Sequence, residues 1–131
     1  MMTPQTIAKA PPVVAVVDDD PAVCNSLKFS LELEGFRVRT FAGGADLLRA
    51  RDVGLCDCFV VDQRMPGLSG LELIGKLRDR KIEAPAILII SQPSAALSAR
   101  AAKAKVPIVE KPFLGNALLE RIHEACRGAD R

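Results

Sequence analysis

Five short apolar runs recur along the chain, and most are rich in valine and isoleucine. Three are continuous, one alternates apolar with polar residues, and the last contains Pro107. Continuous runs of this kind are typical of strands that are buried on both faces of a parallel sheet. Pro107 lacks a backbone donor, which predicts that the fifth strand lies at the sheet edge. The expected strands are residues 13–17, 36–41, 58–62, 86–90 and 106–109.

Apolar residues between these runs recur every three or four positions, which predicts amphipathic helices. The first helix is expected to begin at Pro21, with Asp20 as its N-cap, and to stop at Gly35. Further helices are expected at 45–50, after a turn at 65–70, over 94–103 and near the C-terminal end. The apolar stripes of these helices are Val23, Leu27 and Leu31 in the first, Leu71, Ile74 and Leu77 in the third, and Leu114, Leu118, Ile122 and Ala125 in the last.

Strands and helices thus alternate five times, which predicts an α/β fold: a doubly wound, five-stranded parallel sheet with helices on both faces. The 131 residues suit one domain. We expect that domain to span residues 13–127. A loose, proline-rich N-terminal tail (1–12) and a short C-terminal tail (128–131) would flank it.

Composition narrows the classes of function. The formal net charge is only +2 and no basic cluster occurs, which argues against direct nucleic-acid binding. The longest apolar run, residues 84–90, is too short to span a membrane, and no signal peptide is evident. Four cysteines occur without zinc-site spacing, and we interpret two of them, Cys56 and Cys58, as small, half-buried thiols. Thiols of this kind are typical of a reducing cytoplasm.

Candidate chemistry gathers at three strand ends. The first strand is followed by Asp18 and Asp19, the third ends in Asp62, and the fifth is followed by Lys111. Ligands of open parallel sheets bind beyond the carboxyl ends of the strands. Two carboxylates about 4 Å apart repel by roughly 4 kcal/mol at an effective dielectric of 20. We therefore expect a bound cation that offsets this repulsion. Oxygen donors favour Mg²⁺.

The segments VVDDDPAV, VVDQRMPGLSG and VEKPF resemble those of response-regulator receiver domains, in particular the FixJ-type subfamily of these CheY-like proteins. The resemblance covers about residues 12–127. It implies a flavodoxin-like receiver fold with strand order 2-1-3-4-5. It also implies a signalling domain rather than an enzyme, one that catalyses only its own phosphorylation and dephosphorylation.

The same resemblance implies a role for each site residue. Asp62 would accept a phosphoryl group from a histidine kinase or a phosphotransfer protein. Asp18, Asp19, Asp62 and the backbone carbonyl of Arg64 would hold Mg²⁺, and Lys111 would pair with the phosphoryl oxygens. Charge neutralisation and positioning are what phosphoryl transfer requires.

Two positions depart from the family pattern. Receivers carry Ser or Thr at the end of the fourth strand, and the resemblance implies that this hydroxyl binds the phosphoryl group and couples it to movement of the next loop. This chain has Ile90 there, with Ser91 one place later. Ser91 is a candidate displaced switch hydroxyl, and Ile90 is the alternative occupant. The aromatic residue that usually lies three places before the lysine is here Ile108. We therefore expect the residues for phosphorylation to be complete, and the residues that transmit phosphorylation to neighbouring segments to differ from the family pattern.

The departures leave a second hypothesis open: a protein-interaction module with receiver fold whose output does not depend on phosphorylation. A haloacid-dehalogenase-type hydrolase is disfavoured because Arg64 stands where that chemistry needs a second acid. The family also suggests homodimerisation through the fourth helix, the fifth strand and the fifth helix.

Overall fold

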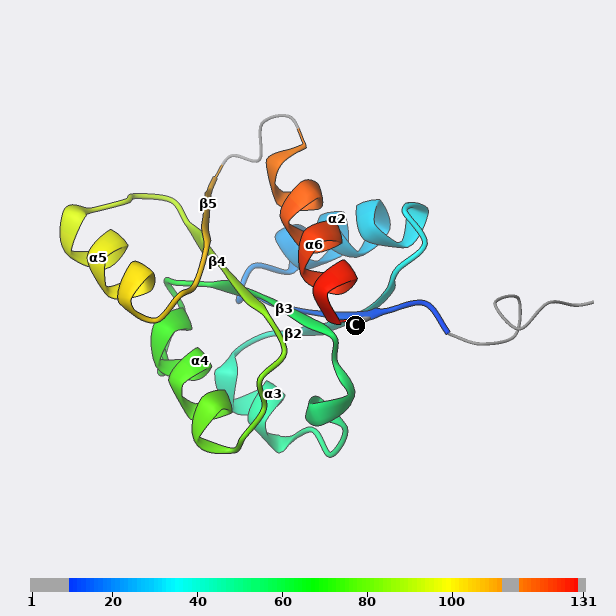
Figure 1. Cartoon of the computed structure of the whole chain (residues 1–131), viewed down its shortest axis with the longest axis horizontal. Helices are drawn as coiled ribbons and strands as arrows, with labels where there is room; N and C mark the ends of the chain where they lie inside the picture. Colours follow the sequence, from blue (N-terminus) through cyan, green and yellow to red (C-terminus); the bar gives the residue numbers. More distant parts are fainter. Residues whose placement is uncertain (1–9, 112–115, 130–131) are drawn as a thin grey trace, which may run out of the picture.

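The computed structural model describes residues 10–111 and 116–129. Its centre is a five-stranded parallel sheet with the order β2-β1-β3-β4-β5 (Figure 1). This confirms the doubly wound α/β fold and the strand order. The strands are β1 (Val13–Val17), β2 (Arg37–Phe41), β3 (Cys58–Asp62), β4 (Ala86–Ile90) and β5 (Ile108–Glu110). The helices are α2 (Pro21–Leu33), α3 (Gly44–Arg49), the short 3-10 helix η1 (Val53–Leu55), α4 (Gly70–Asp79), α5 (Ala95–Lys103) and α6 (Ala117–Ala129).

Two layers of helices cover the sheet. The helices α2 and α6 lie on one face, while α3, α4 and α5 lie on the other (Figure 1). Because neighbouring residues of a strand point to opposite faces, each strand contributes to both cores. In β4, for example, Ile87 and Ile89 pack against the α2–α6 layer, whereas Leu88 and Ile90 pack on the opposite side. The strands β3 and β4 are buried throughout, as their continuous apolar runs predicted.

The first helix begins and ends as its residues predicted. The side chain of Asp20 accepts a hydrogen bond from the Ala22 N–H at 2.9 Å, and Pro21 is the first helical residue. Gly35 follows the helix with φ of +96°, a conformation that favours glycine. The N-terminal end fixes where the loop that carries Asp18 and Asp19 gives way to α2.

The fifth strand differs from its predicted bounds. It covers Ile108–Glu110 rather than residues 106–109. Lys105 has a φ of 60°, so the chain turns immediately before the strand. Pro107 has no N–H, and only its carbonyl takes part in the sheet, accepting the Leu88 N–H at 2.9 Å. The strand nevertheless lies at the sheet edge, as Pro107 predicted.

The last helix and the cysteines bear on two further expectations. In α6, Leu118 and Ile122 are buried against the sheet, while Leu114 lies outside the described residues. The thiols are more enclosed than expected, because all four cysteines are buried. None of the helices within the described ranges combines the length and the apolar character needed to cross a membrane.

Candidate functional site

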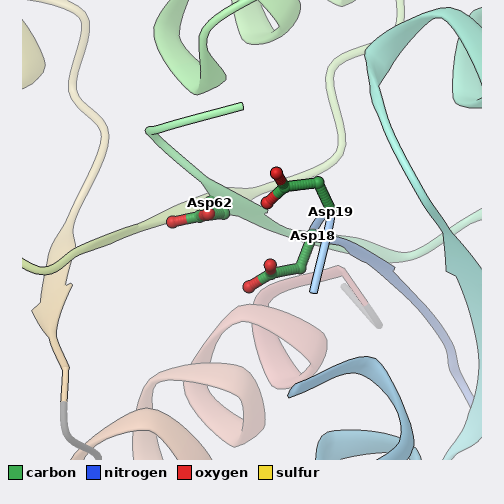
Figure 2. A group of neighbouring side chains, drawn as sticks. All are labelled: Asp18, Asp19 and Asp62. Atoms are coloured by element: carbon green, nitrogen blue, oxygen red, sulfur yellow. The ribbon is translucent and has the colours of Figure 1, made fainter. Parts of the chain in front are cut away.

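Three acidic side chains meet beyond the carboxyl ends of β1 and β3 (Figure 2). One carboxylate oxygen from each of Asp18, Asp19 and Asp62 lies within 4.8 Å of the other two. Asp18 and Asp62 are only 1% and 5% exposed, whereas Asp19 is exposed. The structure therefore brings together three of the predicted site residues, one of them open to solvent.

Lys111 joins this group from β5. Its Nζ lies 3.2 Å from Asp18 Oδ2 and 3.6 Å from Asp62 Oδ1. The backbone N–H of Lys111 donates to the Ile90 carbonyl at 2.8 Å, which extends the β4–β5 ladder and sets the place where the side chain begins. One ammonium group thus contacts both buried carboxylates.

The charges of the site do not balance. Three carboxylates against one ammonium group leave a net charge of −2 when all four are ionised. Burial raises the pKa of Asp62, and the Asp18 charge raises it further, while Lys111 and a hydrogen bond from the Arg64 backbone N–H oppose the rise. Burial alone would lower the pKa of Lys111, but Asp18 and Asp62 outweigh it, so this pKa is raised. A divalent cation fits both this charge and the all-oxygen donor set.

Backbone contacts hold Asp18 in place. Its N–H donates to the Phe41 carbonyl at 3.1 Å, and its Oδ1 accepts the Asp20 N–H at 2.9 Å. The thiol of Cys24 donates to the Asp18 carbonyl at 3.3 Å. Asp18 is therefore held by β2 and by the first turn of α2. Its second carboxylate oxygen, Oδ2, contacts Lys111.

Asp62 is positioned by the start of α4. The Gly70 N–H donates to the Gln63 carbonyl at 3.1 Å, and a Cβ at Gly70 would lie 2.7 Å from the Asp62 carbonyl oxygen. Only glycine permits so close an approach. Ser69 and Glu72 close the helix start with a capping box, in which each side chain accepts the other residue's backbone N–H.

The residues around the start of α4 carry one local sequence signal. The spacing Ser69–x–x–Glu72 is the usual pattern of a capping box. For Gly70 the composition of residues 65–70 predicts only a turn. The Cys24 thiol contact had no sequence signal, because it depends on how α2 packs beside β1.

Arg64 and Ser91 lie on neighbouring loops beside the acidic group. The Arg64 side chain is exposed, and its Nη2 donates to Gln92 Oε1 at 3.3 Å. Ser91 is exposed as well, and in the described part of the chain it makes no hydrogen bond to Asp62. Ile90, the last residue of β4, is 2% exposed and belongs to the core. The structure thus does not join Ser91 to the acidic group.

The same two loops border an open hollow of about 550 Å³ between the beginnings of α4 and α5. Its wall includes Arg64, Ile90, Ser91, Gln92 and Arg100. Ile108, at the position where the family usually has an aromatic residue, is partly buried against the core on this face of the sheet.

Comparison with known proteins decides the family. The family model described as the response regulator receiver domain matches residues 14–123. The chain belongs to this family. Receiver domains are the signalling domains of two-component systems and accept phosphoryl groups from histidine kinases.

Individual relatives agree with this assignment. The transcriptional regulatory protein FixJ of Rhizobium meliloti (strain 1021) is 35% identical over 113 residues, which cover 86% of this chain and 55% of FixJ. The receiver domain therefore spans about half the length of that relative. A CheY-like receiver domain protein from Methanospirillum hungatei JF-1 has a TM-score of 0.83 at 26% identity, covering 92% of this chain and 97% of its own. The BeF3-activated DrrB receiver domain has a TM-score of 0.80 at 26% identity, covering 89% and 98%.

Proposed function

We propose that this receiver domain accepts a phosphoryl group on Asp62 from the phosphohistidine of a histidine kinase or a phosphotransfer protein. The arrangement of Asp62 supports the proposal best. It is a buried carboxylate 3.6 Å from one ammonium group, with two further carboxylates within 4.8 Å. A carboxylate in these surroundings can act as a nucleophile and can have its product charge neutralised.

In the proposed transfer, an Asp62 Oδ attacks phosphorus in line with the bond to the histidine nitrogen. The P–O bond forms as the P–N bond breaks, and the imidazole leaves and takes up a proton from solvent. The Lys111 ammonium group, 3.6 Å from Asp62 Oδ1, holds the carboxylate in place for the attack. Later attack of water on the acyl phosphate returns Asp62 and releases phosphate.

We assign the Mg²⁺ site to Asp18, Asp19, Asp62 and the backbone carbonyl of Arg64. Mg²⁺ bound there would supply positive charge to the phosphoryl oxygens during transfer. Asp19 is the exposed member of the acidic group, so it gives the cation a route from solvent. Asp18 also contacts Lys111, and for this reason it links the ammonium group to the metal site.

The partner surfaces remain proposals of the same kind. A cytoplasmic kinase is the expected donor, and homodimerisation through α5, β5 and α6 stays a prediction. Most of the α5 surface is accessible to a partner, because Ala101 is the one buried residue of this helix in the described structure.

Incubation with Mg²⁺ and acetyl phosphate, followed by a phosphate-affinity gel, tests the proposal. We expect one shifted band that disappears when Mg²⁺ is chelated and in the Asp62→Asn variant. If the folded wild-type protein gave no shifted band, the result would favour an interaction module that works without phosphorylation. Ile90, in place of a hydroxyl residue, is the reason to test that alternative. A shift that survives Asp62→Asn would place the phosphoryl group elsewhere.

A further inference from the structure

We infer that Arg64 is the residue that binds the phosphoryl group in place of the missing hydroxyl, and that it leaves Gln92 to do so. This rests on the proposed function, since it concerns the phosphorylated state of Asp62. It assigns to the Arg64 side chain a role beyond that of its backbone carbonyl at the metal site. The side chain would sense the phosphoryl group and carry the signal to the next loop.

The first support is the apolar end of β4. Ile90 is buried in the core and its side chain has no donor, while the following Ser91 is exposed and makes no hydrogen bond to Asp62 in the described residues. A phosphoryl group on Asp62 would therefore meet Lys111 on one side and no hydroxyl from the end of β4. The hollow next to Ile90 is also lined by Gln63, the residue that follows Asp62.

The second support is the position of Arg64. It lies two residues from Asp62, at most about 7 Å along the backbone. The guanidinium group lines the hollow, is exposed and is free of any acidic partner within the described residues. An arginine can bind two oxygens of a phosphoryl group at once, which a hydroxyl cannot.

The third support is the weakness of its present contact. The bond from Arg64 Nη2 to Gln92 Oε1 is 3.3 Å, longer than a usual hydrogen bond, and its acceptor is neutral. Phosphorylation replaces the carboxylate with an acyl phosphate and adds about one further negative charge. The guanidinium group then has a charged acceptor in place of an amide, and charge-assisted bonds are roughly twice as strong as neutral ones.

The consequence for signalling follows from what Gln92 belongs to. The Arg64–Gln92 bond ties the loop after β3 to the loop between β4 and α5. When Arg64 turns toward the phosphoryl group, this tie opens and releases the loop that leads into α5. Phosphorylation would thus reach α5 without a hydroxyl at the end of β4 and without an aromatic residue at Ile108.

Beryllofluoride with Mg²⁺, a non-covalent mimic of the phosphoryl group on aspartate, provides the test. NMR of the ¹⁵N-labelled chain would follow the Arg64 Nε signal and the Gln92 side-chain amide during titration. In the wild type both signals should move together. In Arg64→Gln the half-saturating beryllofluoride concentration should rise about tenfold, as expected for loss of one charge-assisted hydrogen bond.

Three further variants make the outcome specific. Arg100→Gln removes the other arginine of the same hollow and should change the half-saturating concentration by less than about twofold, because Arg100 belongs to α5 and is not among the charges that act on Asp62 in the described residues. Gln92→Ala should bind beryllofluoride at least as tightly as the wild type, since no tie must be broken. Ile90→Thr should restore part of the lost affinity to Arg64→Gln, because it returns a hydroxyl to the end of β4.

The inference is overturned if Arg64→Gln binds beryllofluoride like the wild type, or if the Gln92 signal stays in place while Asp62 becomes occupied. The underlying function fails in a different way. In that case even the wild type would show no change in NMR signals that depends on Asp62. Incubation with acetyl phosphate would also give no phosphorylated protein.

Discussion

Gly70→Ala should destabilise the domain, even though alanine is usually the better helix residue. A Cβ at this position would lie 2.6 Å from Leu88 Cδ1, 2.7 Å from the Asp62 carbonyl oxygen and 3.0 Å from the Gln63 Cα. Two of these neighbours are backbone atoms at the end of β3, so neither can rotate away. Overpacking of this kind costs about 1–3 kcal/mol, whereas the gain in helix propensity is at most about 1 kcal/mol. Subtracting the full gain leaves a net loss of up to about 2 kcal/mol.

The same helix supplies a matched control. Gly75 also lies in α4, and a Cβ added there would meet nothing within 4 Å. Gly75→Ala should therefore stabilise the domain by about 0.5–1 kcal/mol. Urea denaturation followed by circular dichroism measures both free energies of unfolding, and unchanged m-values would show that only stability differs. If the two variants were stabilised alike, the close packing of α4 against Asp62 would be wrong.

Three further predictions concern the charged groups of the site. Asp62→Asn should raise the free energy of unfolding at neutral pH. Because the pKa of Asp62 is raised in the folded protein, wild-type stability falls as the pH rises from the unfolded to the folded pKa value. Urea denaturation at several pH values should therefore show the stability advantage of the Asn variant shrinking toward acid pH. Mg²⁺ should raise the Tm of the wild type in a thermal melt but not that of Asp18→Asn, because binding to the folded state alone stabilises it; an equal rise in both would contradict the assigned ligands. Lys111→Met should lower stability by about 1–3 kcal/mol, because it leaves Asp18 buried beside Asp62 without a counter-ion. It should also slow phosphorylation by acetyl phosphate, and a rate equal to that of the wild type would remove Lys111 from the site.

The strand ends were predictable because they depend on local pattern and on one rule of topology. Continuous apolar runs predicted β1, β3 and β4. Because β1 and β3 pair in parallel, Asp18 and Asp62 had to meet at the carboxyl end of the sheet. Lys111 followed in the same way from β5, although the strand itself begins two residues later than predicted. That shift arises from the turn at Lys105 and from the missing donor of Pro107, which override the apolar character of residues 106 and 107.

Contacts between side chains of different loops were not predictable from pattern. The Arg64–Gln92 bond and the Cys24–Asp18 bond join residues whose proximity depends on how loops and helices settle against the finished sheet. The same holds for the end of β4. Sequence counting left Ile90 and Ser91 as alternatives, and only the packing shows Ile90 inside the core and Ser91 at the surface.

The central claim, that Asp62 is the phosphoacceptor, is tested most directly by locating the modification. After reaction with acetyl phosphate and Mg²⁺, intact-mass and peptide mass spectrometry would count the phosphoryl groups and assign them to residues. The account predicts one phosphoryl group per chain, on Asp62, and none on the Asp62→Asn variant or in the presence of a chelator. A phosphoryl group found on another residue, or none on a folded wild-type chain that binds Mg²⁺, would contradict it.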